Sequence, residues 1–177
     1  MIVMKAENLS IEFGGLKAVQ NFNLELKEHE LLAIIGPNGA GKTTTFNMLT
    51  GIYKPTAGTI MIGDKKMNGL RANLFTEAGI ARTFQNIRLF GDATVLENLV
   101  IAMNLQVRYN MFDALVRTPK YRKQEKELKE QAMALLEIFG LGDKRDFLAK
   151  NLQYGEQRRL EIARALATKP QILCLDE

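Results

Sequence analysis

The stretch GPNGAGKT, Gly36–Thr43, decides the fold of this 177-residue chain. It matches the pattern G-x-x-x-x-G-K-[ST], in which glycines let the backbone wrap with its N–H groups pointing inward around an anion. The continuous apolar run before it, Leu31–Ile35, predicts a strand buried on both faces of a parallel sheet. A helical stretch, Thr43–Thr50, follows and directs its positive N-terminal end at the same anion. This strand–loop–helix context disfavours the alternative of a flexible turn with a chance match.

The loop predicts a nucleotide phosphate site with a metal ion. Lys42 is expected to reach the β- and γ-phosphates, and the Thr43 hydroxyl is expected to bind Mg²⁺. Contacts to the nucleotide are predicted for the whole loop and the start of the helix: Gly36, Pro37, Asn38, Gly39, Ala40, Gly41, Lys42, Thr43 and Thr44.

Two carboxylates, Asp176 and Glu177, follow the apolar run Ile172–Leu175. Mg²⁺ in proteins usually keeps one or two carboxylate ligands, and phosphate-loop proteins supply one at the end of another buried strand. Asp176, which lies 134 residues after Lys42, is predicted to be this acid, the alternative being a residue that caps the next loop. Glu177 is then expected to orient or deprotonate an attacking water.

The composition is that of an ordinary soluble globular protein, with 46% apolar and 25% charged residues. A net charge of +4 is mild and does not itself argue for nucleic acid. The single cysteine, Cys174, excludes a disulfide within the chain and is expected to be an inert core residue, and the single histidine, His29, is expected at the surface. Neither a signal peptide nor an apolar run near the ~18 residues of a membrane span is present, which predicts a cytosolic chain.

Local patterns predict the remaining elements. Ile2–Leu9, Asn21–Leu26 and Thr59–Ile62 are expected to be strands, and Thr94 with Glu97 fits a capping box at the start of a helix. A long helix is expected over Tyr121–Phe139, with Gly140 as its stop. Its apolar stripe is Leu128, Ala132, Leu135, Leu136 and Phe139, and its opposite face is expected to be solvated and paired as Glu125–Lys129 and Lys126–Glu130 rather than to bind a partner.

A further helix is expected to begin near Gly155. Its inward side chains are predicted to be Leu160, Ala163 and Leu166, and its outward ones Arg158, Arg159 and Glu161. The whole segment Leu152–Leu166, LQYGEQRRLEIARAL, resembles the signature of ABC-transporter ATPases, whose usual form is L-S-G-G-Q followed by a helix. Gln85, in RTFQ, resembles the Q-loop glutamine of that family. With the phosphate loop and Asp176 in the same order, the resemblance covers essentially the whole chain.

Within that family, the segments FGGLKAV, RTFQNIRLF, TVLENL and DALVRTPKYR are similar to the ATP-binding subunit of branched-chain amino-acid importers. The resemblance implies an α/β phosphate-loop NTPase with an N-terminal antiparallel β subdomain, a RecA-like parallel core and an inserted helical subdomain. We expect one ABC ATPase domain over residues 1–177, with the β subdomain and phosphate-loop core at about 1–90, the helical insertion at about 91–155 and the return to the core at about 156–177.

Members of the family continue beyond the acid pair, with a D-loop, a strand and a switch histidine. The resemblance therefore predicts a chain that is truncated at its C-terminus, with a core incomplete after Asp176. The following strand belongs between the phosphate-loop strand and the Asp176 strand, so its absence would leave a slot of roughly 10 Å. Each unpaired backbone group along such a slot would cost about 1–3 kcal/mol.

The resemblance also implies the roles of residues outside the loop. Two ATPase subunits pair head to tail, and each ATP lies between the loop of one and the signature of the other, here Gln153, Tyr154, Gly155, Glu156 and Gln157. Gly155 would place helix N–H groups on the γ-phosphate, whereas Gln153 and Tyr154 replace the usual Ser and Gly. Gln85 would contact Mg²⁺ and the water, and link them to the helical region that touches the membrane partner. Phe13 would stack on adenine, the alternative being a core aromatic.

The implied activity is ATP hydrolysis that powers the import of branched-chain amino acids. The implied cofactors and partners are ATP, Mg²⁺, a second ATPase subunit, transmembrane permease subunits and, indirectly, a substrate-binding protein, at the cytoplasmic face of the membrane. One alternative is a fragment that binds nucleotide or a partner without turnover. Another is an ABC domain acting on nucleic acid or ribosomes, which the single cassette and the importer-like insert at about 104–122 disfavour.

Overall fold

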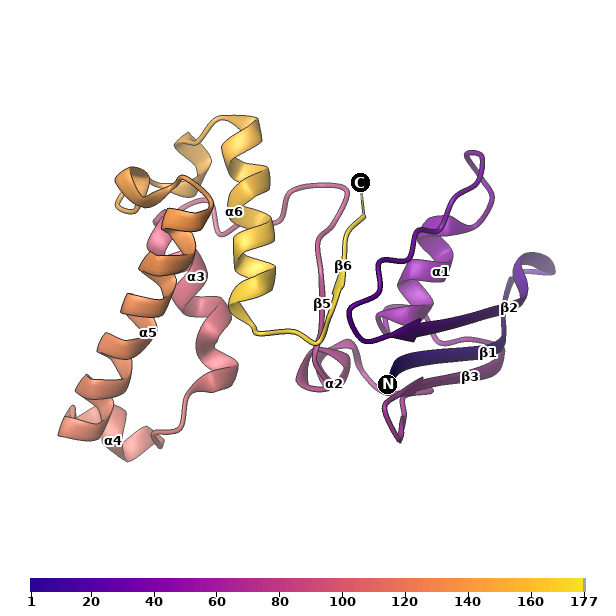
Figure 1. Ribbon diagram of the computed structural model, residues 1–177, viewed down its shortest axis with the longest axis horizontal. Helices are drawn as coiled ribbons and strands as arrows, with labels where there is room; N and C mark the ends of the chain where they lie inside the picture. The colour runs from indigo at the N-terminus through magenta and orange to yellow at the C-terminus, as the bar shows by residue number, and fades with distance from the viewer. Residues whose placement is uncertain (177) are drawn as a thin grey trace. The chain divides into compact units, whose positions relative to one another are not determined.

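The computed structural model describes residues 1–176, which form two compact units (Figure 1). The first, called here the N-terminal unit, comprises Met1–Arg82 together with Asp176. The second, the helical unit, comprises Thr83–Leu175. The finer division near residues 90 and 155 stays a prediction.

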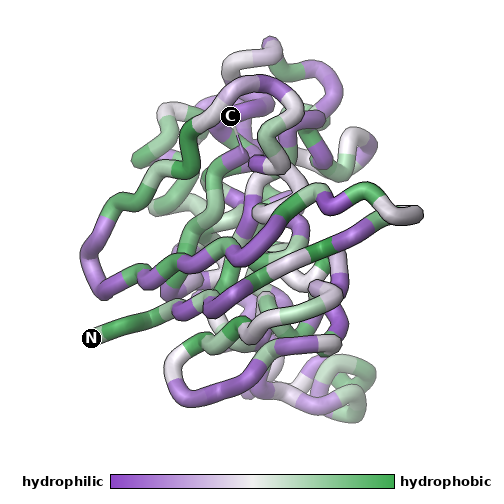
Figure 2. Tube along the Cα trace, turned by 90° about the vertical axis from the view of Figure 1, so that its right-hand side faces the viewer, coloured by the Kyte–Doolittle hydropathy of each residue, from purple (hydrophilic) through white to green (hydrophobic). Residues whose placement is uncertain are grey.

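An antiparallel sheet builds the N-terminal unit. Its strands are β1 (Ile2–Phe13), β2 (Leu16–Lys27), β3 (Ala57–Ile62) and β4 (Lys65–Lys66), in the order β2-β1-β3-β4. Hydrophobic and hydrophilic positions interchange along the strand that starts at the marked N-terminus (Figure 2), as expected for a sheet with one covered face. The predicted antiparallel β subdomain is therefore confirmed, with strands longer than predicted.

One helix follows the phosphate loop in this unit. It is α1 (Lys42–Leu49), and α2 (Ala72–Glu77) and β5 (Ile80–Arg82) follow β3 and β4. The buried apolar residues of the unit come from the sheet, α1, α2, β5 and the turn after β4: Met4, Ala6, Leu9, Ile11, Met48, Leu49, Ile60, Ile62, Met67, Phe75, Ile80 and Ala81. The predicted helix after the loop is confirmed.

The strand predicted at Leu31–Ile35 is not formed. Leu31 and Ile35 are 97% and 90% exposed, and no backbone partner for this segment lies within residues 1–176. A strand buried on both faces needs neighbours that pair with its backbone and cover its side chains. Within residues 1–176, no segment pairs with this backbone and none covers the side chains of Leu31 and Ile35. The apolar composition of the segment is therefore insufficient to predict a strand.

Three packed helices form the helical unit: α3 (Val95–Ala102), α5 (Pro119–Ile138) and α6 (Tyr154–Ala167). Short 3₁₀ turns lie at Met103–Gln106, Gly142–Lys144 and Ala149–Asn151, and the unit also contains α4 (Met111–Val116) and β6 (Ile172–Cys174). Its core includes Val95, Leu99, Met103, Leu128, Ala132, Leu136, Leu141, Leu160 and Ala163. No helix within residues 1–176 combines the length and hydropathy needed to cross a bilayer.

Most local predictions for the helices are confirmed. Thr94 and Glu97 form the capping box, with the Glu97 N–H donating to Thr94 Oγ1 at 3.1 Å and the Thr94 N–H donating to Glu97 Oε2 at 2.7 Å. Gly140, with φ of 63°, follows the end of α5 as predicted. The Lys126–Glu130 pair is present at 3.8 Å, and His29 is 92% exposed.

Three predictions about side-chain environments are wrong. Glu161, expected to face solvent, is 2% exposed because it binds groups from another segment. Glu125 accepts a hydrogen bond from Tyr109 Oη instead of pairing with Lys129. Cys174 is only half-buried, and the strand containing it ends there, so Leu175 is 51% exposed.

Titration of Tyr109 tests how its loop is anchored to α5. Its hydroxyl donates to Glu125 Oε1 at 2.8 Å, and this carboxylate together with burial raises the pKa of Tyr109 to about 12. Because the unfolded value is near 10, this contribution to stability is present below pH ~10 and is lost as the pH rises toward ~12. Absorbance titration near 295 nm should show the transition at pH ~12 disappear in Tyr109→Phe and move to lower pH in Glu125→Gln. An unchanged titration in Glu125→Gln would contradict this anchoring.

Candidate functional site

The phosphate loop takes a conformation that its glycines make possible. Gly39 and Gly41 have φ of 83° and 82°, in the left-handed region that favours glycine. At Gly41 a β-carbon would also lie 2.8 Å from the carbonyl oxygen of Ala18 on β2. Gly41 is therefore required twice, by its backbone conformation and by the close approach to the sheet.

The start of α1 presents donors toward the loop. The N–H groups of Lys42, Thr43 and Thr44 have no acceptor within residues 1–176, whereas the Thr45 N–H donates to the Gly41 carbonyl at 2.8 Å. Lys42 Nζ donates to the carbonyl oxygens of Gly36 and Pro37, at 2.7 and 2.9 Å, and so lies over the loop. N–H groups, the helix dipole and an ammonium therefore converge where an anion would bind.

A groove of about 490 Å³ runs beside this loop. Val19 and Phe22 of β2 line it on one side, and Ile35, Ala40 and Lys42 line it on the other. The groove belongs to the N-terminal unit, because every lining residue comes from that unit.

Phe13 lies at the end of β1 and is 45% exposed, so it is not a core residue. Its ring packs edge-to-face on Tyr53, with 5.4 Å between the centroids and 72° between the planes. An exposed ring held in this way can present a face for stacking on another aromatic group.

Asp176 is held by a side chain whose role the sequence did not indicate, Arg82. Arg82 Nη2 donates to Asp176 Oδ2 at 2.6 Å, and Nη1 donates to Asn47 Oδ1 and Thr50 Oγ1 at 2.7 and 3.0 Å. The two charged side chains are 7% and 14% exposed. Arg82 thus fixes Asp176 relative to the C-terminal half of α1, the helix that begins at the phosphate loop. The feature of the sequence that could have identified Arg82 is its position as a charged residue at the end of the apolar strand β5 (Ile80–Arg82).

Replacing Arg82 with Met is expected to lower the free energy of unfolding by about 3–5 kcal/mol, because it removes the guanidinium that compensates the nearly buried Asp176 carboxylate. Urea unfolding followed by circular dichroism measures this change. Arg71→Met, which removes an exposed arginine of the same unit, is the matched control. Equal unfolding midpoints for the two variants would show that the pair does not stabilise Asp176.

The donors at the predicted metal site suit Mg²⁺. In the N-terminal unit, Thr43 offers a hydroxyl oxygen on the first turn of α1 and Asp176 offers a carboxylate, whereas Gln85, the third predicted ligand, belongs to the helical unit. Among residues 1–176, no cluster of three or more His, Cys, Asp or Glu side chains could hold a metal ion. Such a small set fits an ion that takes its remaining ligands from water and substrate phosphates.

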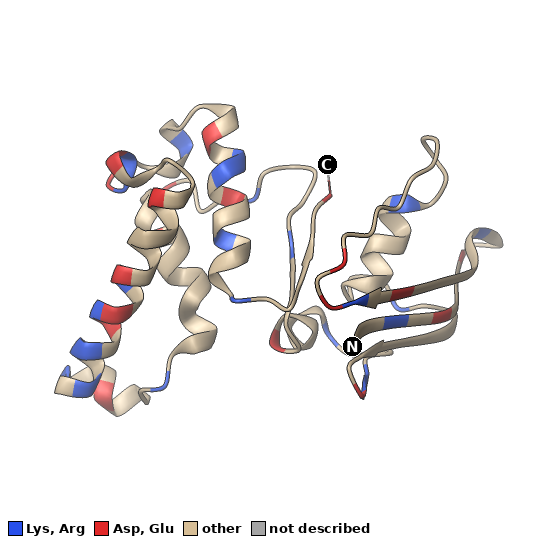
Figure 3. Cartoon of the chain, viewed as in Figure 1, with Lys and Arg blue, Asp and Glu red and all other residues tan. Residues whose placement is uncertain are grey.

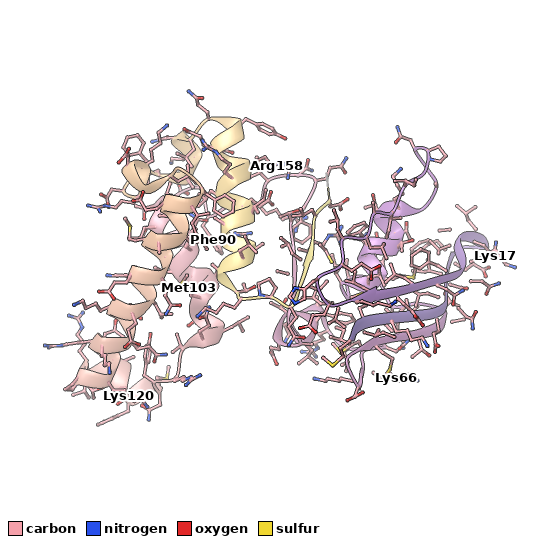
Figure 4. All side chains as sticks on the ribbon, in the orientation of Figure 1. Lys17, Lys66, Phe90, Met103, Lys120 and Arg158 are labelled. Atoms are coloured by element: carbon pink, nitrogen blue, oxygen red, sulfur yellow. The ribbon has the colours of Figure 1, made fainter. Side chains whose placement is uncertain are left out.

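In the helical unit, Gln85 is tied to the signature helix α6. Arg158, labelled in Figure 4, extends from α6 and donates from Nη1 to the Phe84 carbonyl at 2.7 Å and from Nη2 to the Gln85 carbonyl at 3.0 Å. Glu161 of the same helix accepts from Arg158 Nη1 at 2.9 Å and from the N–H groups of Phe84 and Arg88, each at 3.4 Å. The buried pair on α6 therefore fixes the backbone around Gln85.

The signature residues form the exposed start of α6. The helix begins at Tyr154, Gly155 is exposed with open space around it, and neither N–H group has an acceptor in the described part of the chain. Glu156 accepts from the Gln153 N–H at 3.2 Å, and the adjacent Lys144 ammonium lowers the pKa of its carboxyl below the ordinary value. Gln157 Nε2 donates to the Leu152 carbonyl at 2.9 Å.

The predicted site residues are divided between the two units. The phosphate loop, Phe13 and Asp176 belong to the N-terminal unit, whereas Gln85 and Gln153–Gln157 belong to the helical unit. Glu177, predicted as the catalytic base, lies outside the described residues.

Comparison with known proteins identifies the family of the chain. The ABC transporter family model matches residues 19–177. The high-affinity branched-chain amino acid transport ATP-binding protein LivG of Escherichia coli (strain K12) is 48% identical over 175 residues, which are 99% of this chain and 69% of LivG. BraF of Pseudomonas aeruginosa, described as the same kind of ATP-binding protein, is 44% identical with the same coverage.

Two solved ATP-binding cassettes share the fold. MJ1267, a cassette of an ABC transporter, superposes with a TM-score of 0.80 at 31% identity, covering 98% of this chain and 68% of that one. MJ0796, solved as a dimer in a post-hydrolysis state bound to ADP and Pi, gives a TM-score of 0.79 at 30% identity, covering 98% and 73%. The predicted resemblance is confirmed, and the chain belongs to the ABC transporter family as an ABC-type ATPase.

Proposed function

We propose that this chain binds and hydrolyses ATP to power the import of branched-chain amino acids. The observation that carries the proposal is the phosphate loop, in which Lys42 Nζ lies against the loop carbonyls and the first N–H groups of α1 have no acceptor in residues 1–176. The 48% identity to LivG, over 99% of the chain, supports the choice of transported substrate.

Each group of the N-terminal unit has a role in binding ATP. Lys42 and the loop N–H groups would hold the β- and γ-phosphates, where transfer chemistry depends mostly on position and charge. Phe13 would stack on the adenine base. Thr43 and Asp176, which both belong to this unit, would hold Mg²⁺, and the ion would neutralise charge on the phosphates.

The signature would act on the nucleotide of a second subunit. Gly155 and the start of α6 are exposed and present N–H groups without acceptors in residues 1–176, as a contact in trans requires. The dimeric structure of MJ0796 supports a two-subunit assembly. Glu177 would serve as the base, and the Arg158–Glu161 pair would transmit the position of Gln85 to the signature helix.

The expected partners are transmembrane permease subunits, so the chain would work at the cytoplasmic face of the membrane. Uptake of labelled leucine into vesicles that contain the permease, the binding protein and the second ATPase subunit tests this role. ATP-dependent uptake that requires this chain is the expected result. Unchanged uptake without the chain would contradict the proposal.

Phosphate release separates turnover from binding alone. The chain with its partner subunits is expected to release phosphate, and Glu177→Gln is expected to bind ATP with little release. Equal rates for both proteins would exclude Glu177 as the base. ATP binding with no release by either would favour the alternative of a module that binds nucleotide without turnover.

A further inference from the structure

Helix α4 exposes an unusual number of large apolar side chains. Met111, Phe112, Leu115 and Val116, called here the apolar tip, are 90%, 68%, 82% and 58% exposed. Because residues four apart lie on the same side of a helix, these four positions share one face of α4. The tip is therefore one continuous apolar surface on the helical unit.

Hydrogen bonds fix the apolar tip in this outward orientation. The Asp113 N–H donates to Asn110 Oδ1 at 2.8 Å, the Asn110 N–H donates back to Asp113 Oδ2 at 3.2 Å, and Thr118 Oγ1 donates to Asp113 Oδ1 at 3.0 Å. Before the helix, Tyr109 packs edge-to-face on Tyr121 of α5 with 4.9 Å between centroids. Asp113 is thus hydrogen-bonded to Asn110 and Thr118 within the chain, whereas the four apolar side chains of α4 remain exposed.

Basic residues flank the tip in the sequence and outnumber the acidic ones there. Residues 104–126 contain six basic and two acidic side chains, and the remainder of the chain contains eighteen of each, so this segment accounts for the entire net charge of +4. In Figure 3, Lys and Arg positions, coloured blue, recur along the end of α5 that adjoins α4. An open groove of about 850 Å³ lies there, and its lining contains four basic and two acidic residues: Arg117, Arg122, Lys126 and Lys129 with Glu125 and Glu130. The basic residues are Arg108, Arg117, Lys120, Arg122, Lys123 and Lys126, of which the three lysines also form ion pairs, with Asp113, Glu127 and Glu130 at 3.8–4.0 Å.

We propose that the apolar tip and its basic surroundings dock on an anionic phospholipid surface. An exposed apolar helix face flanked by lysines and arginines is the composition that lies in the interface of a bilayer, with apolar side chains at the headgroup boundary and cations on the phosphates. The charge complementarity selects an anionic bilayer as the occupant. This contact uses no residue of the nucleotide site, so it does not depend on the proposed ATP hydrolysis.

Vesicle cosedimentation tests the proposal without nucleotide. The chain is expected to bind vesicles of phosphatidylcholine with phosphatidylglycerol, and to bind phosphatidylcholine vesicles weakly. Because each basic residue near an anionic surface strengthens binding about fivefold, Arg117→Glu with Arg122→Glu should weaken binding by at least about tenfold. Phe112→Ser with Leu115→Ser should weaken it by about the same factor.

Matched double variants control for charge and for exposed apolar area. Lys65→Glu with Lys66→Glu reverses two exposed cations on β4, and Ile101→Ser with Ile138→Ser changes two exposed apolar residues of α3 and α5. Both controls should bind as the unaltered chain does, and circular dichroism confirms that all variants fold. Equal binding to both vesicle types, or equal losses in the controls, would overturn the proposal. Retention by detergent-solubilised permease without vesicle binding would overturn it in favour of a protein contact.

Discussion

Replacing Lys42 with Met is expected to lower ATP affinity or phosphate release by about 10²–10³-fold, the cost of losing one positioned charge at a phosphate site. Lys42 Nζ lies 2.7 and 2.9 Å from two loop carbonyls, so the neighbouring backbone holds its position above the loop. Methionine keeps the length of the side chain and removes the charge. Equilibrium titration with a fluorescent ATP analogue measures binding, and a coupled phosphate assay measures turnover.

Lys17→Met is the matched control for this variant. Lys17 is an exposed residue of β2 in the same unit and is labelled in Figure 4. Its replacement should leave ATP affinity and phosphate release within about twofold of those of the unaltered chain. Wild-type binding and release by Lys42→Met would show that the loop is not the phosphate site. A change in the melting curve of Lys42→Met, measured in parallel, would reveal a loss of folding instead.

The second large effect is expected in the helical unit. Glu161→Ala should lower the free energy of unfolding by about 3–5 kcal/mol, because it leaves the Arg158 guanidinium without its carboxylate partner in a largely buried position. Glu161 is 2% exposed and accepts hydrogen bonds from three groups. Urea unfolding followed by circular dichroism reports the change, and hydrogen exchange of the segment around Gln85 should become faster.

Glu130→Ala is the control for Glu161→Ala. Glu130 forms an exposed pair with Lys126 at 3.8 Å on α5, and such pairs contribute about 0–1 kcal/mol. Glu161→Gln keeps one carbonyl acceptor, so its free energy of unfolding should lie between those of Glu161→Ala and Glu130→Ala. If Glu161→Ala lowers the free energy of unfolding no more than Glu130→Ala does, the Arg158–Glu161 pair does not hold the segment around Gln85 in place.

Elements governed by local interactions could be predicted from the sequence. The capping box of Thr94 and Glu97 and the stop at Gly140 involve residues a few positions apart. The same holds for the phosphate loop, whose glycines and lysine form one short segment. In these cases the residues that determine the structure are neighbours in the sequence, so their pattern is visible there.

Environments set by distant residues could not be predicted. Glu161 binds the Phe84 N–H across 77 residues, and Arg82 binds Asp176 across 94. A helical period identifies which face is apolar, but it does not show that a charged residue beside that face has a buried partner. The strand expected at Leu31–Ile35 failed for the same reason, because a strand is defined by its neighbours in the sheet.

Hydrogen exchange with and without Mg²⁺ and ATP tests the central claim, that the loop at Gly36–Thr44 binds the phosphates through its backbone. The N–H groups of Lys42, Thr43 and Thr44 have no acceptor in residues 1–176, so they should exchange rapidly in the absence of nucleotide. The account predicts that MgATP slows exchange in the peptide covering this loop and that Lys42→Met weakens the protection. ATP binding with no protection of this peptide would contradict the account.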